Sequence, residues 1–195
     1  MTKKEKICVY TCITGNYDNL KEIPNIENGI DYYCFTNNKK IKSNTWKVIY
    51  IEDDKLSNVQ LARKTKILGN DIVNSYDIAL WMDGAVIFNK PIMKFINYYL
   101  KENDAFVAFK HGERNSIKDE AYACYRFNKE TKDNIKKLLK FLEKEKYEDN
   151  NGLIESTVYI KRPKDKLVKK TMKMWFDMIV KYTKRDQLSF NYCIS

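Results

Sequence analysis

Short apolar runs alternate with helix-like periodicities along the whole chain, and this alternation restricts the fold more than any other feature. Five runs have the length and the β-branched or aromatic content of strands: Ile7–Ile13, Ile30–Thr36, Trp46–Ile51, the run that ends at Asp83 and Ala105–Phe109. A sixth run, Leu153–Ile160, is a strand or a loop that enters one. Helices are predicted at Ser57–Leu68, Ile92–Leu100, Ile117–Tyr125, a segment capped by Asn128 or Thr131 and a last long segment from Pro163, with a turn at Asn150–Gly152. Because such alternation is typical of α/β domains, we expect three layers around a mostly parallel sheet.

The length and composition suit one globular domain over residues 1–195. Hydrophobic residues make up 44% of the chain and charged residues 32%. No apolar run approaches the ~20 residues of a membrane span, and the basic N-terminal segment lacks the apolar core of a signal peptide. The sequence therefore favours a cytoplasmic protein, with peripheral attachment at the inner membrane face as an open extension.

The formal net charge is +10 at pH 7. Nucleic acid, an anionic membrane surface and phosphorylated substrates are all partners that suit such an excess. The lysines are spread along the whole chain, however, as they are on an ordinary solvated surface. No recognisable nucleic-acid motif is present, so we expect no nucleic acid partner. A basic nucleic-acid-binding module remains the weaker alternative, and its affinity would fall steeply with added salt.

The five cysteines form no C-x-x-C pair, and their number is odd. Most of them lie inside apolar strand-like runs. Buried free thiols are therefore predicted in preference to disulfides or a zinc site.

The stretch Leu80–Val86 is the first functional candidate, because one carboxylate and one glycine interrupt an otherwise apolar run. Ligands of open α/β sheets bind just beyond the carboxyl ends of strands. A buried Asp83 would be costly unless it met a metal, a cation or several donors, and Gly84 would let a ligand or backbone approach closely. A carboxylate that only caps the following turn is the competing interpretation.

Two neighbouring segments could contribute to the same site. The first strand ends in Thr14–Asp18, a small-residue loop that lacks both G-x-G-x-x-G and the lysine of a P-loop. Arg63 lies three residues before Lys66, so both side chains can lie along one face of the predicted helix. Either cation could clamp a diphosphate, or could be an ordinary surface charge.

Seven blocks of the sequence resemble, in order and spacing, a little-studied glycosyltransferase-like family of bacterial surface-polysaccharide loci and plant Golgi proteins. They are Val9–Asp18, Asp31–Thr36, Ala62–Leu68, Leu80–Gly84, His111–Arg114 with Glu120, Gly152–Glu155 and Arg185–Phe190. The resemblance covers nearly the whole chain. It implies a GT-A-like fold, with a nucleotide-binding half at 1–90 and an acceptor-binding half at 91–195.

The resemblance also implies a nucleotide-sugar site and a divalent metal, Mn²⁺ or Mg²⁺, held through Asp-x-Asp. Here the stretch is Asp83-Gly84-Ala85, so Ala85 replaces the second carboxylate and Asp83 is the one metal ligand expected. Asn37 and Gly112 are two further departures. The nucleotide-sugar-binding residues implied are Thr11, Thr14, Gly15, Tyr17, Arg63, Lys66, Asp83, Gly84, His111, Arg114 and Gln187.

Inverting sugar transfer needs one carboxylate within hydrogen-bond reach of the acceptor hydroxyl. Asp186 is the first candidate because Arg185-Asp186-Gln187 follows a helix and precedes an aromatic run. Glu155 is the second candidate and Glu120 the third. A salt bridge or a helix cap explains Asp186 equally well, and a retaining reaction would change the assignment.

We therefore expect a glycosyltransferase that moves a sugar from a UDP- or GDP-linked donor to a polysaccharide, glycan or lipid-linked acceptor. A non-catalytic nucleotide-sugar binder, or a hydrolase on the same scaffold, is the main alternative because of Ala85. The basic surface adds an anionic membrane as a further possible partner.

Overall fold

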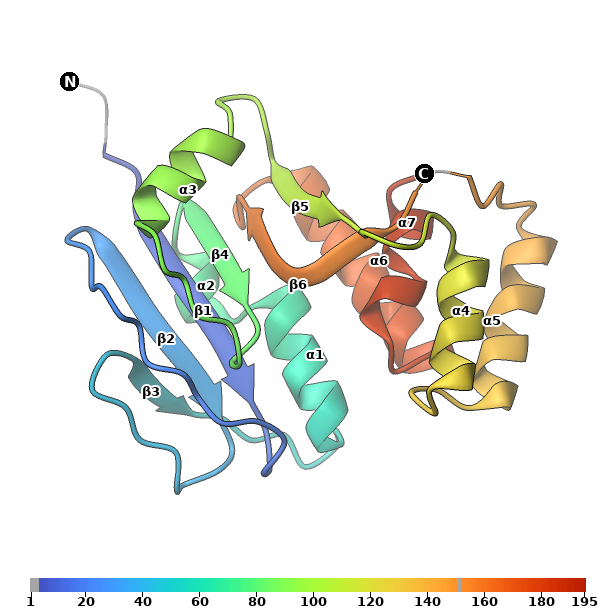
Figure 1. Ribbon diagram of the computed structural model, residues 1–195, viewed down its shortest axis with the longest axis horizontal. Coiled ribbons are helices and arrows are strands. Elements are labelled where there is room, and N and C mark those ends of the chain that lie inside the picture. The colour runs from blue at the N-terminus through green and yellow to red at the C-terminus, as the bar shows by residue number, and fades with distance from the viewer. Residues whose placement is uncertain (1–3, 151) are drawn as a thin grey trace. The chain divides into compact units, whose positions relative to one another are not determined.

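A computed structural model describes residues 4–150 and 152–195 and has the predicted α/β architecture (Figure 1). One six-stranded sheet has the order β3-β2-β1-β4-β6-β5. Strand β1 pairs in parallel with β2 and with β4, β2 pairs in parallel with β3, and β4 pairs antiparallel with β6. The strands are β1 Ile7–Ile13, β2 Ile30–Thr36, β3 Lys47–Tyr50, β4 Ile78–Met82, β5 Phe106–Lys110 and β6 Ile154–Lys161.

Seven α-helices and one 3₁₀ helix are present among the described residues. They are α1 Asn58–Leu68, α2 Asp71–Asn74, α3 Ile92–Tyr99, α4 Ile117–Arg126, α5 Lys132–Lys144, α6 Lys166–Tyr182, the 3₁₀ helix η1 Asp186–Leu188 and α7 Phe190–Cys193.

The chain divides into two compact units. The first comprises residues 1–107 and 157–169, and the second comprises residues 108–156 and 170–195. Strands β5 and β6 and helix α6 each contribute residues to both units. The chain therefore passes from one unit to the other after residues 107, 156 and 169. The nucleotide-binding half predicted at 1–90 and the acceptor-binding half predicted at 91–195 are defined by the ligands they would bind, so they stay a prediction.

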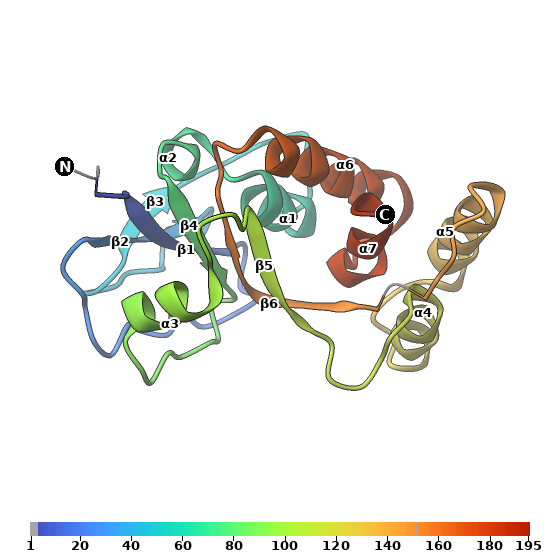
Figure 2. The ribbon, with the colours of Figure 1, turned by 90° about the horizontal axis from the view of Figure 1, so that it is seen from above.

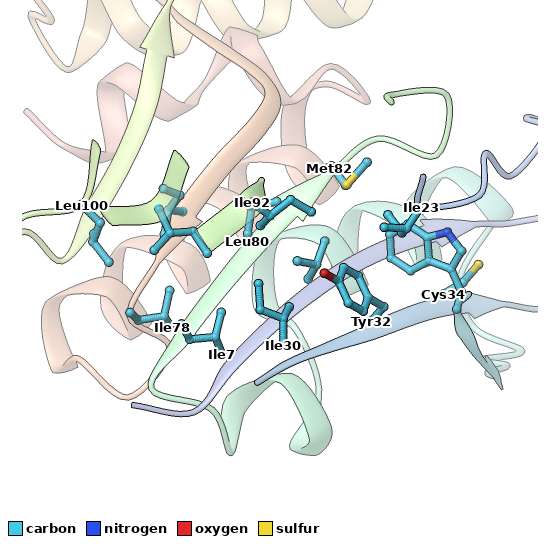
Figure 3. Packing of buried hydrophobic residues seen from close by; sticks show 14 residues of the cluster. Ile7, Ile23, Ile30, Tyr32, Cys34, Ile78, Leu80, Met82, Ile92 and Leu100 are labelled. Atoms are coloured by element: carbon cyan, nitrogen blue, oxygen red, sulfur yellow. The ribbon is translucent and has the colours of Figure 1, made fainter. Parts of the chain in front are cut away.

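The first unit has three layers, with α1 and α2 on one face of its strands and α3 on the other (Figures 1 and 2). Its main core lies on the α3 face, where fourteen buried residues form one cluster (Figure 3). The side chains alternate along each strand, so the residues that enter this cluster are two apart: Ile7 and Val9 of β1, Ile30, Tyr32 and Cys34 of β2, and Ile78, Leu80 and Met82 of β4. The predicted three-layer, mostly parallel fold is confirmed.

Helix α1 is fixed at both ends. Ser57 and Gln60 form a capping box at its N-terminus, and Gly69, at a positive φ of 70°, follows its last residue. At the C-terminal end, the hydroxyls of Tyr10 and Tyr159 donate to the carbonyl of Lys66. These bonds satisfy a carbonyl that the last turn leaves without an intrahelical partner.

The second unit is built around α4, α5 and the chain after α6. Thr131, one of the two predicted caps, begins α5 and accepts from the backbone N–H of Asn134. The buried carboxylate of Glu130 accepts from Thr131 and Asn134 and also from Thr183 and Lys184, so it joins the start of α5 to the segment after α6. Burial by itself would raise the pKa of Glu130, but these hydrogen bonds lower it overall.

Several boundaries differ from the sequence predictions. Helix α6 begins at Lys166 and not at Pro163, because the Asp165 side chain accepts from the N–H of Val168 and so caps the first turn. The short helices α2 and α7 were not predicted, since four residues carry too little periodicity. The turn predicted at Asn150–Gly152 includes residue 151, which lies outside the described residues.

Two predictions from composition can be compared with the structure. All five cysteines are free and buried, as predicted: Cys8, Cys12, Cys34, Cys124 and Cys193. Across the described segments, the helices lack the combination of length and apolar character that crossing a membrane requires.

Candidate functional site

The topology of the sheet places Asp83 at a switch point. From β1 the chain continues to β2 and β3 on one side, whereas β4 pairs with the other side of β1. The loops after β1 and β4 therefore leave neighbouring parallel strands in different directions. Such points at the carboxyl edge of a sheet are where open α/β folds bind ligands, and Asp83 is the first residue after β4.

One oxygen of Asp83 is held by two side chains. Its Oδ1 accepts from the indole Nε1 of Trp81 at 2.9 Å and from Lys66 Nζ at 3.3 Å. No described residue donates a hydrogen bond to Oδ2, and the side chain is 40% exposed. The carboxylate is thus oriented by the protein through one oxygen and can offer the other to a ligand.

The Lys66 side chain is only 1% exposed, so its contact with Asp83 lies on the buried side of that carboxylate. Its Nζ lies 5.2 Å from the centre of the Trp81 ring, close enough for a cation–π interaction. The carbonyl of the same residue is fixed by Tyr10 and Tyr159. The predicted neighbour on the helix, Arg63, is half-buried one turn earlier.

Asparagine side chains organise the loop after β1. Asn37 accepts from the N–H of Gly15 at 2.8 Å and donates to Asn58, while Asn38 donates to the Gly15 carbonyl. The hydroxyl of Thr14 donates to the Asn58 carbonyl at 2.7 Å. The predicted ligand donors Thr14 and Gly15 therefore already have protein partners, and Asn37 has a structural role where an aspartate was expected.

Gly84 packs against the end of β1. A Cβ atom at this position would lie 2.6 Å from Cδ1 of Ile13 and 3.6 Å from the hydroxyl of Thr11. Close packing of two strand ends is thus sufficient reason for this glycine. The Thr11 hydroxyl is buried and has no hydrogen-bond partner among the described residues. Tyr17, in the loop after β1, is largely exposed.

The residues present could supply one ligand to a divalent metal, the Oδ2 atom of Asp83. The described parts of the chain contain no group of three or more His, Cys, Asp or Glu side chains that could hold such an ion by themselves. Mg²⁺ is commonly held by one or two carboxylates together with substrate phosphates. The site therefore fits a metal that arrives with a nucleotide diphosphate better than a resident ion.

In the second unit, His111, Arg114 and Glu120 form one cluster, in which His111 and Glu120 are buried and Arg114 is half-buried. Arg114 Nε donates to Glu120 Oε2, and Nη1 donates to Glu113 at 2.9 Å. The ring Nδ1 of His111 accepts from the N–H groups of Glu113 and Arg114, both at 3.1 Å. Burial lowers the pKa of Arg114, but the two carboxylates raise it overall. Arg114 is thus already paired.

Arg185 extends this cluster. Burial lowers its pKa, whereas Asp186, Cys124 and Glu120 raise it overall. Burial, together with Glu120, raises the pKa of the Cys124 thiol to about 11. Within the part of the chain that the structure describes, the buried guanidinium Nε of Arg185 has no hydrogen-bond partner.

Glu155, Asp186 and Gln187 form a second cluster in this unit. The Ser156 hydroxyl donates to Asp186 Oδ2 at 3.1 Å, and Asp186 is only 2% exposed. The amide of Gln187 lies 3.5 Å from a carboxylate oxygen of Glu155. Glu155 is half-buried, so it is the more accessible of these two predicted carboxylates.

The structure thus groups the predicted residues within each unit but gives them different surroundings. Trp81, Ser156 and Arg185 belong to these groups and were not predicted. Trp81 could have been found from the sequence, because residues two apart in a strand share one face. Ser156 and Arg185 could have been found only as chain neighbours of Glu155 and Asp186.

Comparison with protein families agrees with the glycosyltransferase resemblance. A family model described as "TOD1/MUCI70, glycosyltransferase-like domain" matches residues 1–195. No curated protein matches the chain. Among solved structures, the apo form of the WbbM bifunctional glycosyltransferase is similar, with a TM-score of 0.46 and 8% sequence identity. That match covers 95% of this chain and 39% of the WbbM chain.

Proposed function

Because the chain belongs to the TOD1/MUCI70 glycosyltransferase-like family, we propose that it transfers a sugar from a UDP- or GDP-linked donor to a glycan or lipid-linked acceptor. The observation that carries this proposal is the partly exposed Asp83 carboxylate at the switch point of the sheet. Its position corresponds to the edge at which α/β folds bind nucleotides.

Departure of the nucleotide diphosphate requires positive charge near the phosphates. In the proposed reaction, Lys66 pairs with Oδ1 of Asp83 and leaves Oδ2 for the ligand, so Lys66 is a positioning residue. The Trp81 indole adds a second donor to the same oxygen. A divalent cation bound by Asp83 together with the donor's phosphates would neutralise the charge of the leaving group.

We assign the proton-accepting role to Glu155 and not to Asp186. A general base must reach the acceptor hydroxyl, and Glu155 is half-buried whereas Asp186 is almost fully covered. Asp186 would instead position the segment that carries Gln187, through its bond from Ser156. Glu120 is already paired with Arg114 and would hold that arginine in place.

Binding of nucleotide sugars tests this function directly. Calorimetry with UDP- and GDP-sugars, with and without Mn²⁺, should give binding that Asp83→Asn weakens about tenfold or more, equivalent to ~1.4 kcal/mol. Asp54→Asn is the matched control, because Asp54 is an exposed carboxylate outside the candidate site. Unchanged binding in Asp83→Asn, or no binding of any nucleotide sugar to the wild type, would contradict the proposal.

A non-catalytic nucleotide-sugar binder, or a hydrolase, is the second candidate function. Ala85 supports it, because it replaces the carboxylate that would complete Asp-x-Asp. Mass spectrometry of an acceptor mixture separates the candidates. A transferase adds one sugar to the acceptor, a hydrolase releases free sugar, and a binder does neither. Transfer that survives in Glu155→Gln would show that Glu155 is not the base.

A further inference from the structure

The outward face of α4 combines large exposed aromatic side chains with cations. Ile117, Ala121 and Cys124 are buried on the inner side of the helix. On the outer side, Tyr122 is 68% exposed and Tyr125 48%, and Phe127, just after the helix, is 62% exposed. Three large rings in six residues are more than the scattered exposed apolar residues of an ordinary surface.

The cations lie next to these rings. The guanidinium carbon of Arg126 is 5.9 Å from the centre of the Phe127 ring, and Lys129 Nζ is 6.0 Å from it. Both distances allow cation–π interaction. Between Ala121 and Lys129 the sequence contains no carboxylate. We call Tyr122, Tyr125, Arg126, Phe127 and Lys129 the α4 aromatic face.

We propose that the α4 aromatic face docks on an anionic membrane surface. Aromatic rings with a polar tip, and long cationic side chains with apolar stems, are the residues that settle at the interface of a lipid bilayer. The absence of a carboxylate in this stretch suits the negative surface potential of anionic lipids. The docking is independent of sugar transfer, and only its consequence, delivery of the domain to a lipid-linked acceptor, depends on the proposed function.

A glycan is the less suitable occupant of this face. Ligand sites for small molecules are usually concave and combine apolar walls with several polar groups that fix orientation. The α4 aromatic face is formed by one helix and the residues just after it and itself includes no carboxylate. The nearest exposed carboxylate on the helix is Asp119, three residues before Tyr122. An interfacial membrane contact needs neither a cavity nor a carboxylate.

Flotation of the full chain with lipid vesicles tests the docking in the absence of any nucleotide sugar. The wild type should float with phosphatidylcholine vesicles that contain phosphatidylglycerol, and not with phosphatidylcholine alone. Added salt should release it, because screening weakens exposed charges. Arg126→Gln with Lys129→Gln should weaken binding about 30-fold, since each basic residue near an anionic surface contributes roughly fivefold.

A second variant separates the rings from the charge. Tyr122→Ser, Tyr125→Ser and Phe127→Ser together should abolish flotation with unchanged net charge. Two controls match these changes elsewhere: Lys136→Gln with Lys140→Gln on the exposed side of α5, and Tyr98→Ser on α3, where the ring is also exposed. Both controls should float like the wild type.

Several results would overturn the docking surface. They are no flotation of the wild type, equal flotation with neutral vesicles, wild-type flotation of both face variants, or equal losses in the lysine control. A concentration-dependent dimer that the serine variant dissociates would assign the face to a second copy of the chain. Circular dichroism of each variant should match the wild type, since all substituted side chains are exposed.

Discussion

At the level of single residues, Gly84 determines how closely the end of β4 approaches the end of β1. Because a Cβ atom at this position would overlap the Ile13 side chain, any larger residue requires either that side chain or the end of β4 to shift. The Asp83 carboxylate accepts hydrogen bonds from two side chains that differ in their separation from it in the sequence. Trp81 is two residues away and could be expected from strand periodicity, whereas Lys66 is seventeen residues away on another element.

Replacing Gly84 with alanine should therefore destabilise the protein. The added methyl group would lie 2.6 Å from Cδ1 of Ile13 and 2.9 Å from Cγ1, and overpacking of this kind costs about 1–3 kcal/mol. Urea unfolding of Gly84→Ala measures the loss. Adding Ile13→Val should restore part of the stability, because valine lacks the nearer of the two contacting atoms.

Gly112→Ala is the control for this substitution, because a Cβ atom there has no neighbour within 4 Å. Its free energy of unfolding should stay within about 0.5 kcal/mol of the wild type. Equal stability of Gly84→Ala and Gly112→Ala would show that the contact with Ile13 is relieved without cost.

At the level of elements, the C-terminal end of α1 is held by buried polar groups from two strands. The hydroxyls of Tyr10 and Tyr159 donate to the Lys66 carbonyl, and Lys161 Nζ donates to the Ile67 carbonyl at 2.7 Å. Burial lowers the pKa of Lys161 to about 7. This lysine is therefore a cost to the fold whenever it must carry its charge.

The sign of the resulting pH dependence follows from the two states of Lys161. Its pKa is about 7 in the folded protein, whereas an unperturbed lysine has a pKa of 10.5. Between these values the unfolded chain holds a proton that the folded chain lacks, so stability should rise with pH, by up to about 1.4 kcal/mol per pH unit. The cost is fully present below pH 7 and disappears above pH 10.5.

Urea unfolding of the wild type and of Lys161→Met between pH 7 and 8.5 measures this slope. The variant lacks the amine, so its stability should rise less steeply with pH even if the unpaired Ile67 carbonyl lowers it overall. The range stops at 8.5 because burial also raises the pKa of Cys8 and Cys12 to about 12, which lowers stability at higher pH. Parallel slopes in the two proteins would contradict the prediction.

At the level of the whole molecule, the two units share β5, β6 and α6. Each unit therefore contains only part of each of these three elements. Both units contain buried cysteines, so thiol exposure can follow the unfolding of each unit. Cys8, Cys12 and Cys34 lie in the first unit, and Cys124 and Cys193 lie in the second. Burial raises the pKa of each thiol, to about 12 for four of them and to about 11 for Cys124.

All five thiols should therefore resist a disulfide reagent at pH 8 in the native protein, where a pKa of 11 leaves about one thiol in a thousand as thiolate. Along a urea titration, pulse labelling followed by mass spectrometry should show all five becoming reactive in one transition, because the shared elements couple the units. Labelling of Cys124 and Cys193 at a lower urea concentration than the other three would show that the second unit unfolds by itself.

The sequence alone determined the order and type of the long elements, the burial of the cysteines and the family, because alternation along strands and periodicity along helices are local properties of the chain. The tertiary structure decided what each polar side chain meets. It directed Lys66 inward to Asp83, tied Thr14 and Gly15 to asparagines, and covered Asp186 while leaving Glu155 more accessible. Those partners lie on separate elements, so only packing of the folded chain can bring them within hydrogen-bond distance.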